Sequence, residues 1–376
     1  MISERKIIPL FKVAIHPQAE KFISQVLCSG WIGEGPRVKE FEKALALQFN
    51  NPYCLALNSG TGGLRLALEL IATKNRGKGG GKVITTPLTC FATVAPILTR
   101  GWDIVWADVQ KESLNIDPGS IREKIDKDVS AILVVHWGGY PCDMEEIKEI
   151  SAEYNIPVIE DAAHTYKAKY KDSIIGDCEY SDFCMISLQA IKFLTSGDGG
   201  LLFAKNKEDY EKGKLLRWFG INRESNRKDL RCEDDISQAG FKLHMNDISA
   251  AIGIANLDLV SAHLEATREN AFFYRKNLKD ISGITLLQDE QDRTSSNWLF
   301  TILVDDLIGF SRKMGESGIM VSKVHARIDK HSCVGKYKDN LPNLDYVDCK
   351  RICIPSGWWI TKGDREYIVD VIKKGW

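Results

Sequence analysis

Residues 131–164 read AILVVHWGGYPCDMEEIKEISAEYNIPVIEDAAH, and this stretch decides the fold class. A short apolar run, Ala131–His136, is followed by a helical pattern at Met144–Tyr154 and by a second apolar run, Pro157–Glu160. Two buried strands joined by a helix form the unit of a parallel sheet, because parallel strands need a crossover connection. The stretch therefore predicts a parallel β-sheet covered by helices.

The same alternation extends from about residue 50 to residue 205. Helical runs such as Leu64–Ala72 separate the apolar segments, which predicts an α/β fold with helices on both faces of the sheet. The predicted strands are Lys82–Thr86, Asp103–Ala107, Ala131–His136, Pro157–Glu160, Phe183–Leu188 and Gly200–Ala204. Ligands of such sheets bind at the carboxyl ends of the strands, so a site is expected in the loops that follow strands.

A long helical pattern from Asn246 to Glu269 follows the sheet region, and Asn270–Trp376 mixes strands with helices. The length of the chain suggests about two domains. We expect residues 1–250 to form a large domain that includes an N-terminal segment. Residues 251–376 would form a linking helix and a smaller C-terminal α/β domain.

The composition of the 376 residues excludes several classes of protein. A hydrophobic content of 44% is too high for a disordered chain, and a net charge of −1 gives no bulk attraction to nucleic acid or to an anionic membrane. Met1–Leu10 is too charged for a signal peptide, and no apolar run reaches ~18 residues. No two of the ten cysteines form a C-x-x-C pair. We expect a cytoplasmic protein with reduced thiols, no metal site, and neither nucleic acid nor membrane as a partner.

Four loops carry residues that suit a ligand, and the first two suit a phosphorylated, planar one. Asn58–Gly63 (NSGTGG) precedes a helix, whose free N–H groups attract a phosphate, although N-capping and a tight turn explain these residues equally well. Thr89–Thr93 contains Phe91, which suits stacking on a ring or packing against a helix.

The other two loops carry charged groups. Asp161 ends an apolar strand, where an unpaired carboxylate is costly; it would face a metal, a sugar hydroxyl or a protonated ring nitrogen, or would cap the next segment. Lys192 follows the strand Phe183–Leu188. An amine in a desolvated site has a lowered pKa and reacts with aldehydes, whereas a solvated surface lysine is the simpler alternative. Together, the four loops match the needs of pyridoxal 5′-phosphate.

At this point the residues resemble a known family, the DegT/DnrJ/StrS sugar aminotransferases, over nearly the whole chain. The resemblance implies the type I aspartate-aminotransferase fold, with a mostly parallel seven-stranded sheet in the large domain and a smaller C-terminal α/β domain. The motifs that carry it are Ser29–Ile32 with Gly35-Pro36 and Phe41-Glu42, Asn58–Thr61, His136–Asp143, Glu160–Ala163, and Ile191-Lys192 with Gly199-Gly200.

The resemblance assigns a role to individual residues. Lys192 would form the Schiff base with the cofactor and then move a proton, Asp161 would pair with the pyridinium nitrogen, and His164 would contact the ring hydroxyl region. These three are the expected catalytic residues, and Phe91 would stack on the ring. Two subunits of a homodimer would share each site, and the residues expected to hold the phosphate are Gly60, Thr61, Gly62, Ser187 and, from the partner subunit, Lys242.

This chain departs from the family pattern at two places. Many members have Asn and Arg where it has Lys242 and His244; lysine still donates to a phosphate as a point charge. Gly62 and Gly63 replace residues that are often alanine, at a cost of about 1 kcal/mol each, which predicts a close approach of the backbone to the ligand. A dehydratase branch of the family has His in place of Lys192, so the lysine favours transamination.

We therefore expect a homodimeric aminotransferase that takes nitrogen from L-glutamate, leaving pyridoxamine 5′-phosphate and 2-oxoglutarate. A nucleotide-linked keto-deoxysugar would accept the nitrogen at C-4, or alternatively at C-3, to give an amino-dideoxysugar for a surface polysaccharide or glycoconjugate. Other readings are an amino-cyclitol aminotransferase, a dehydratase, and a regulatory or binding protein that kept the fold. The expected substrate contacts, for which a solvated basic face is the alternative, are Trp31, Lys323, His325, Arg327 and His331.

Overall fold

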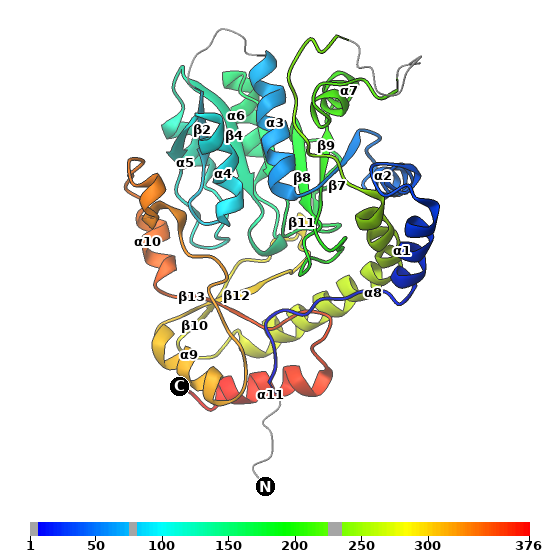
Figure 1. The fold of residues 1–376 in the computed structure, drawn as a ribbon. Helices are drawn as coiled ribbons and strands as arrows, with labels where there is room; N and C mark the ends of the chain where they lie inside the picture. The colour runs from blue at the N-terminus through cyan, green and yellow to red at the C-terminus, as the bar shows by residue number, and fades with distance from the viewer. Residues whose placement is uncertain (1–6, 75–80, 225–234) are drawn as a thin grey trace.

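The computed structural model describes residues 7–74, 81–224 and 235–376. A seven-stranded sheet lies in the upper part of Figure 1. Its neighbouring strands are parallel except for β9, which runs antiparallel to β1 and to β8. The predicted mostly parallel, seven-stranded sheet is confirmed. In spatial order the strands are β1 (Cys54–Leu57), β9 (Gly200–Ala204), β8 (Phe183–Ser187), β5 (Val158–Asp161), β4 (Val129–Val135), β2 (Lys82–Thr85) and β3 (Asp103–Trp106).

Alternate side chains of each strand enter two different hydrophobic clusters, as the twofold period of a β-strand requires. In β1, Leu55 and Leu57 join one cluster, whereas Cys54 and Ala56 join the other. The face of Leu55 is covered by α3 (Gly60–Lys74), α4 (Phe91–Arg100) and α7 (Lys207–Leu216). The opposite face is covered by α2 (Pro36–Gln48), α5 (Pro118–Lys124) and α6 (Met144–Tyr154).

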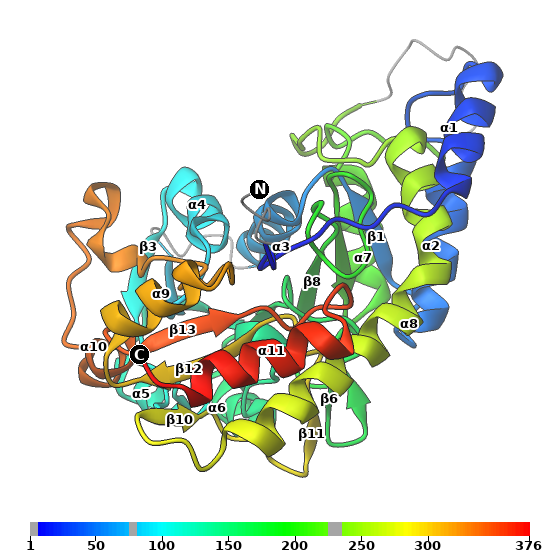
Figure 2. The ribbon, with the colours of Figure 1, turned by 90° about the horizontal axis from the view of Figure 1, so that it is seen from below.

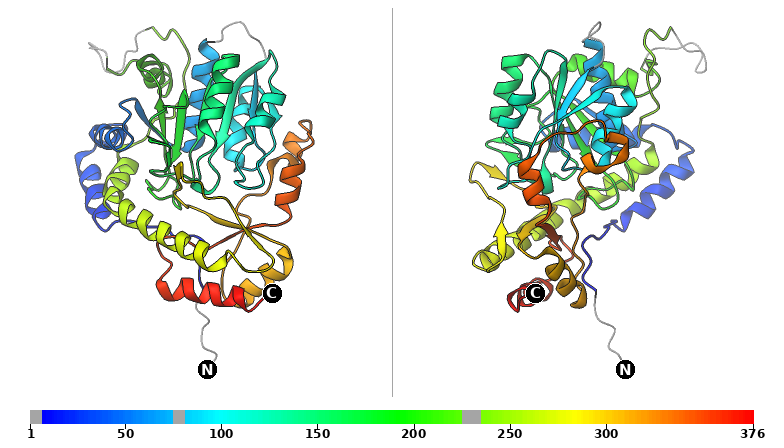
Figure 3. Two further views of the ribbon diagram at one scale, coloured as in Figure 1. Left: turned by 180° about the vertical axis from the view of Figure 1, so that it is seen from behind. Right: turned by 90° about the vertical axis from the view of Figure 1, so that its left-hand side faces the viewer.

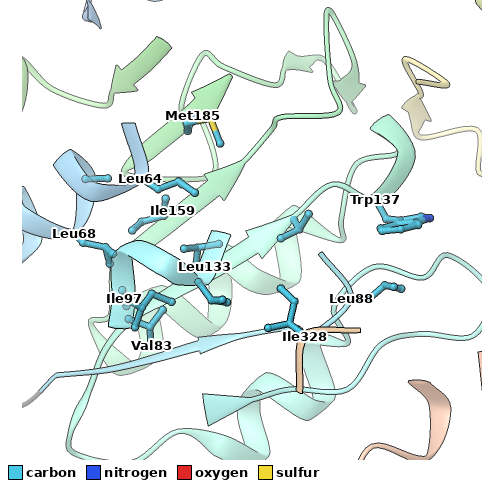
Figure 4. Packing of buried hydrophobic residues seen from close by; sticks show 14 of the residues in the cluster. Leu64, Leu68, Val83, Leu88, Ile97, Leu133, Trp137, Ile159, Met185 and Ile328 are labelled. Atoms are coloured by element: carbon cyan, nitrogen blue, oxygen red, sulfur yellow. The ribbon is translucent and has the colours of Figure 1, made fainter. Parts of the chain in front are cut away.

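The cluster under α3 and α4 is shown in Figure 4, where Leu64, Leu68 and Ile97 of the helices lie close to Ile159 and Met185 of the sheet. All five side chains are buried, and burial of each stabilises the fold by about 1.5–3 kcal/mol. This packing fixes the beginnings of both helices against the carboxyl edge of the sheet.

The predicted strands agree with the structure to within two residues at their ends. β1 was not predicted because its four residues, CLAL, include no β-branched or aromatic side chain, the residue types that mark the other apolar runs as strands. The long helix α8 (Asp247–Leu278) extends beyond the predicted end at Glu269. Its last turns continue because Tyr274 and Leu278 are buried in the hydrophobic cluster of the C-terminal sheet.

That second sheet is antiparallel and three-stranded, with the order β10 (Ile284–Leu286), β12 (Phe300–Val304) and β13 (Arg351–Ile354). Figure 2 shows it from below, with α9 (Leu307–Glu316) and α11 (Lys362–Lys373) beside it. Figure 3 shows how α8 runs from the large sheet to the small one. α8 begins at Asp247, close to the domain boundary predicted at residue 250.

The remaining elements connect these two parts. α1 (Gln18–Ser29) lies along α8, and α10 (Pro342–Asp348) packs on the large-sheet side, where Asp108 accepts hydrogen bonds from Asn343 N and Leu344 N. The short elements are β6 (Lys169–Tyr170), β7 (Ser173–Ile174), β11 (Arg293–Thr294), η1 (Trp137–Gly139), η2 (Ile328–Lys330) and η3 (Ser332–Val334). Within the three described ranges, no helix has the length and apolar character needed to cross a membrane.

Candidate active site

Five strands, β1, β2, β4, β5 and β8, end at the same edge of the large sheet, because they run in the same direction. The four loops singled out in the sequence follow four of these strands, so the fold brings them to one edge. Asp161 is the last residue of β5, and Lys192 lies in the loop between β8 and β9.

The Lys192 amine occupies a desolvated position. The base of its loop is closed by hydrogen bonds from Leu188 N to Gly199 O and from Ser196 N to Leu188 O, of 2.9 and 3.0 Å. Burial lowers the pKa of Lys192 to about 7, although the Asp161 carboxylate acts in the opposite direction. Near neutral pH much of this lysine is therefore the free amine, the form that attacks carbonyl carbons.

The Asp161 carboxylate is buried and held by two donors. Thr93 Oγ1 donates to Oδ2 over 2.7 Å, and the Ala163 N–H donates to Oδ1 over 3.1 Å. Because Thr93 gives its proton to the carboxylate, the Thr89 hydroxyl, 2.7 Å away, must donate to Thr93. Burial raises the pKa of Asp161, and the Thr93 hydrogen bond counteracts this shift most strongly. The two donors leave the carboxylate with room to accept one further hydrogen bond.

We expect Thr93→Val to lower the free energy of unfolding by about 1–3 kcal/mol, because Asp161 loses a buried hydrogen bond and the Thr89 hydroxyl loses its acceptor. Urea unfolding at pH 7 and a fixed protein concentration measures the change. Thr285→Val, at an exposed threonine of β10, is the control and should change the stability by no more than about 0.5 kcal/mol. Equal effects of the two substitutions would contradict this role of Thr93.

His164 is buried and neutral. Its Nδ1 accepts a hydrogen bond from Gly138 N over 3.3 Å, so the ring proton resides on Nε2. Burial, and then the neighbouring Lys192 and His325, hold the pKa of His164 well below its ordinary value. The side chain therefore offers a neutral N–H donor beside the amine.

The predicted phosphate-binding site lies at the beginning of α3, where Ser59 Oγ accepts a hydrogen bond from Gly62 N over 3.0 Å. The close approach predicted for Gly62 and Gly63 is made by the protein: a Cβ on Gly63 would lie 2.9 Å from Met185 Cγ, and one on Gly62 3.0 Å from Asn58 Oδ1. The glycines thus allow α3 to lie against its neighbours, and the close approach to a ligand expected from the sequence stays a prediction. Gly63 N donates to the Ser59 carbonyl over 3.2 Å, so among the described residues the N–H groups of Gly60 and Thr61 are the ones in this first turn left for an anion.

The other expected cofactor contacts lie around the same edge. Gly60 and Thr61 begin α3, and Ser187 ends β8 close to Gly60, whose added Cβ would lie 3.4 Å from Ser187 Cβ. Phe91 begins α4, is 38% exposed, and meets the ring of His331 edge-on at 5.9 Å.

Lys242 is exposed, and among the described residues no carboxylate forms an ion pair with it. Its backbone carbonyl accepts a hydrogen bond from Asn58 Nδ2 over 3.2 Å, so Lys242 contacts the loop Asn58–Gly63 that is predicted to bind the phosphate. His244 does not replace the charge of the arginine found in many family members. It lies on Trp218, with 3.7 Å between ring centroids, and burial lowers its pKa to about 4.

Two expected substrate contacts are engaged elsewhere. The Arg327 guanidinium binds both carboxylate oxygens of Asp329, at 2.8 and 2.7 Å, and also pairs with Asp345. Lys323 Nζ binds the carbonyl and carboxylate of Asp348. These contacts hold Arg327 and Lys323 within the protein, and their predicted contacts with a substrate stay predictions.

His325, in contrast, does reach the site. Its ring is parallel to that of His164, with 5.6 Å between the centroids, and its pKa is lowered to about 4 by burial and by Lys192. Trp31 does not reach it within one protomer. Its indole is 56% exposed and lines an open groove of about 1140 Å³ between α2 and α7. Lys192 does not line this groove.

Sequence reasoning missed Trp298 and the pair under the site. Trp298 stacks on His164 at a centroid distance of 4.2 Å; an aromatic residue after the polar run Ser295–Asn297 was the available signal. His136 Nε2 lies 2.8 Å from Glu160 Oε2, below the loop that carries Asp161. Both residues belong to motifs noted in the sequence, but their contact with each other could not be read from it.

Comparison with known proteins places this geometry in context. The model of the DegT/DnrJ/EryC1/StrS aminotransferase family matches residues 14–373. The chain is 42% identical to AtS13 from Actinomadura melliaura and 39% identical to the sugar aminotransferase CalS13 from Micromonospora echinospora, with TM-scores of 0.95 and 0.94. These alignments cover 99% and 98% of this chain and all of both structures. A UDP-4-amino-4-deoxy-L-arabinose–oxoglutarate aminotransferase of Shewanella sediminis is 30% identical over 87% of this chain and 84% of the relative.

Proposed function

The chain belongs to the DegT/DnrJ/EryC1/StrS aminotransferase family, and on that basis we propose that it moves an amino group from L-glutamate to C-4 of a nucleotide-linked keto-deoxysugar. The observation that carries the proposal is the desolvated Lys192 amine next to the buried Asp161 carboxylate. The name of the Shewanella relative, a 4-amino sugar and oxoglutarate aminotransferase, supports both the carbon and the nitrogen donor.

Pyridoxal phosphate is the cofactor of this family, as expected from the sequence. When bound, it supplies an aldehyde that accepts the amino group and a pyridine ring that withdraws electrons. The chemistry of the donor set fits it: an amine at Lys192, an ionised acceptor at Asp161, and free backbone N–H groups at the start of α3. Phe91 and His164 provide an aromatic surface and a neutral donor.

Each side chain then has a defined task. Lys192 would hold the cofactor through its amine, and the same amine would take and return the proton at the substrate carbon. The Asp161 carboxylate would accept the N–H of the pyridine ring and keep that nitrogen protonated. His164 donates from Nε2 and stays neutral throughout the physiological range, because its pKa is far below 7.

A homodimer completes this proposal. Lys242 is exposed and without a carboxylate partner among the described residues, which suits a contact with a phosphate held by the second subunit. Trp31 is also exposed, which suits a contact with a substrate held in the active site of the second subunit. A cytoplasmic location stays a prediction.

Two half-reactions test the proposed function. Protein saturated with pyridoxal phosphate should convert L-glutamate to 2-oxoglutarate, with a change in the absorbance spectrum of the cofactor. A nucleotide-linked 4-keto-6-deoxyhexose should then restore the first spectrum, and its 3-keto isomer or a keto-cyclitol should not. Restoration by the keto-cyclitol alone, or no reaction with glutamate, would contradict the proposal.

A further inference from the structure

Trp298 contacts the reactive lysine at two points. The indole is 8% exposed, and Lys192 Nζ lies 3.5 Å from its ring centroid. The indole N–H donates over 3.1 Å to the carbonyl of Ile191, the residue immediately before the lysine. One side chain therefore touches both the amine and the backbone that carries it.

The backbone around Trp298 is held by hydrogen bonds to η1 (Trp137–Gly139). Ser296 N and Leu299 N, on either side of the tryptophan, donate to the carbonyls of Gly139 and Gly138 over 3.0 and 3.1 Å. Both glycines have a positive φ, of 91° and 63°, which other residues rarely adopt. The loop His136–Asp143 noted in the sequence thus has a physical use, because its glycines hold the tryptophan segment.

The ring itself is fixed by two aromatic neighbours. His164 and Phe11 stack on it with centroid distances of 4.2 and 5.1 Å, and their planes lie within 27° and 25° of the indole plane. Trp298 therefore has little freedom to move away from Lys192.

Four titratable groups also face the amine from other elements. Asp161 on β5 and Cys90, directly before α4, favour the charged form of Lys192. His164 and His325 are neutral near pH 7, because burial and the lysine charge lower their pKa. Lys192 Nζ also faces the ring of Trp298, whose quadrupole attracts a cation.

We propose that Trp298 is a positioning residue for Lys192: its N–H fixes the backbone before the lysine, and its ring face attracts the ammonium form of the side chain. This attraction opposes desolvation, so that amine and ammonium coexist near neutral pH. The inference rests on the proposed role of Lys192 and deepens it by adding a residue that tunes this lysine.

Competitive acetylation of the full-length protein, freed of cofactor, tests the proposal. Acetic anhydride labels only the amine form, so peptide mass spectrometry across pH 5–11 gives the titration midpoint of Lys192. We expect a midpoint near pH 7 in the wild type and in Trp298→Phe, and one about one pH unit lower in Trp298→Met, which keeps an apolar wall without an aromatic face. Trp358→Met, at a tryptophan that faces Lys12, is the control and should leave the Lys192 midpoint unchanged.

Fluorinated tryptophan gives a second measurement that does not depend on the folding of a variant. Fluorine weakens the negative face of the ring, so the Lys192 midpoint should fall stepwise from tryptophan to 5-fluoro- and 4,5,6,7-tetrafluorotryptophan, and stay constant in a Trp298→Phe background. If neither Trp298→Met nor fluorination changed the titration midpoint of Lys192, the proposal would be overturned. The labelling involves neither glutamate nor a keto sugar, so an incorrect substrate assignment would not change its outcome.

Discussion

Replacement of Lys192 by alanine is expected to lower kcat for transamination by at least about four orders of magnitude. The variant loses both the nucleophile and the group that moves the proton. Because the catalytic residues act as a unit, loss of this one residue removes most of the rate enhancement. Steady-state release of 2-oxoglutarate from L-glutamate, with a saturating keto sugar, measures the loss.

Lys205→Ala is the control for this experiment, because Lys205 is an exposed lysine immediately after β9. It should keep kcat within about twofold of the wild type. If Lys192→Ala retained full turnover, the assignment of the active site would be wrong.

The second large effect is expected from Asp161→Asn, which should lower kcat by at least about a hundredfold. The amide has nearly the same shape as the carboxylate but carries no charge to stabilise a protonated pyridine ring. The pH profile gives an independent check. Burial raises the pKa of Asp161, so protonation on the acid side removes the required carboxylate and lowers the wild-type rate. Asp161→Asn should lack this component of the acid limb.

Asp182→Asn provides a matched control, because Asp182, which directly precedes β8, binds the opposite end of β5. Asp182 Oδ2 accepts from Val158 N over 2.9 Å, at the start of β5 and far from the carboxyl edge. An asparagine oxygen can accept the same hydrogen bond, so kcat should stay within about threefold. If Asp182→Asn and Asp161→Asn lost the same activity, the loss would reflect damage to β5.

Much of the fold was predictable because its signals are local. Apolar runs separated by helical patterns identified six strands of the large sheet, and the rule that ligands bind at carboxyl ends led to Asp161 and Lys192. β1 was missed because its sequence, CLAL, has no β-branched or aromatic residue to distinguish a short strand from part of a helix. The chemical identity of the two main side chains was thus accessible before their surroundings were known.

The partners of charged residues were not predictable in this way. The sequence shows that Arg327 is a cation but not that Asp329 and Asp345 surround it, because Asp345 reaches it only through the packing of α10. Trp298 lies 107 positions from Ile191, whose carbonyl it binds, and the contact depends on the connection between the two sheets. Long-range contacts of this kind decide which cations remain available to a substrate.

The most direct test of the central claim is to identify the lysine that holds the cofactor. Protein incubated with pyridoxal phosphate is reduced with sodium borohydride, digested, and analysed by peptide mass spectrometry. The account predicts a single stable phosphopyridoxyl adduct, on Lys192, that is absent from Lys192→Ala. An adduct on another lysine, or none at saturating cofactor, would contradict it.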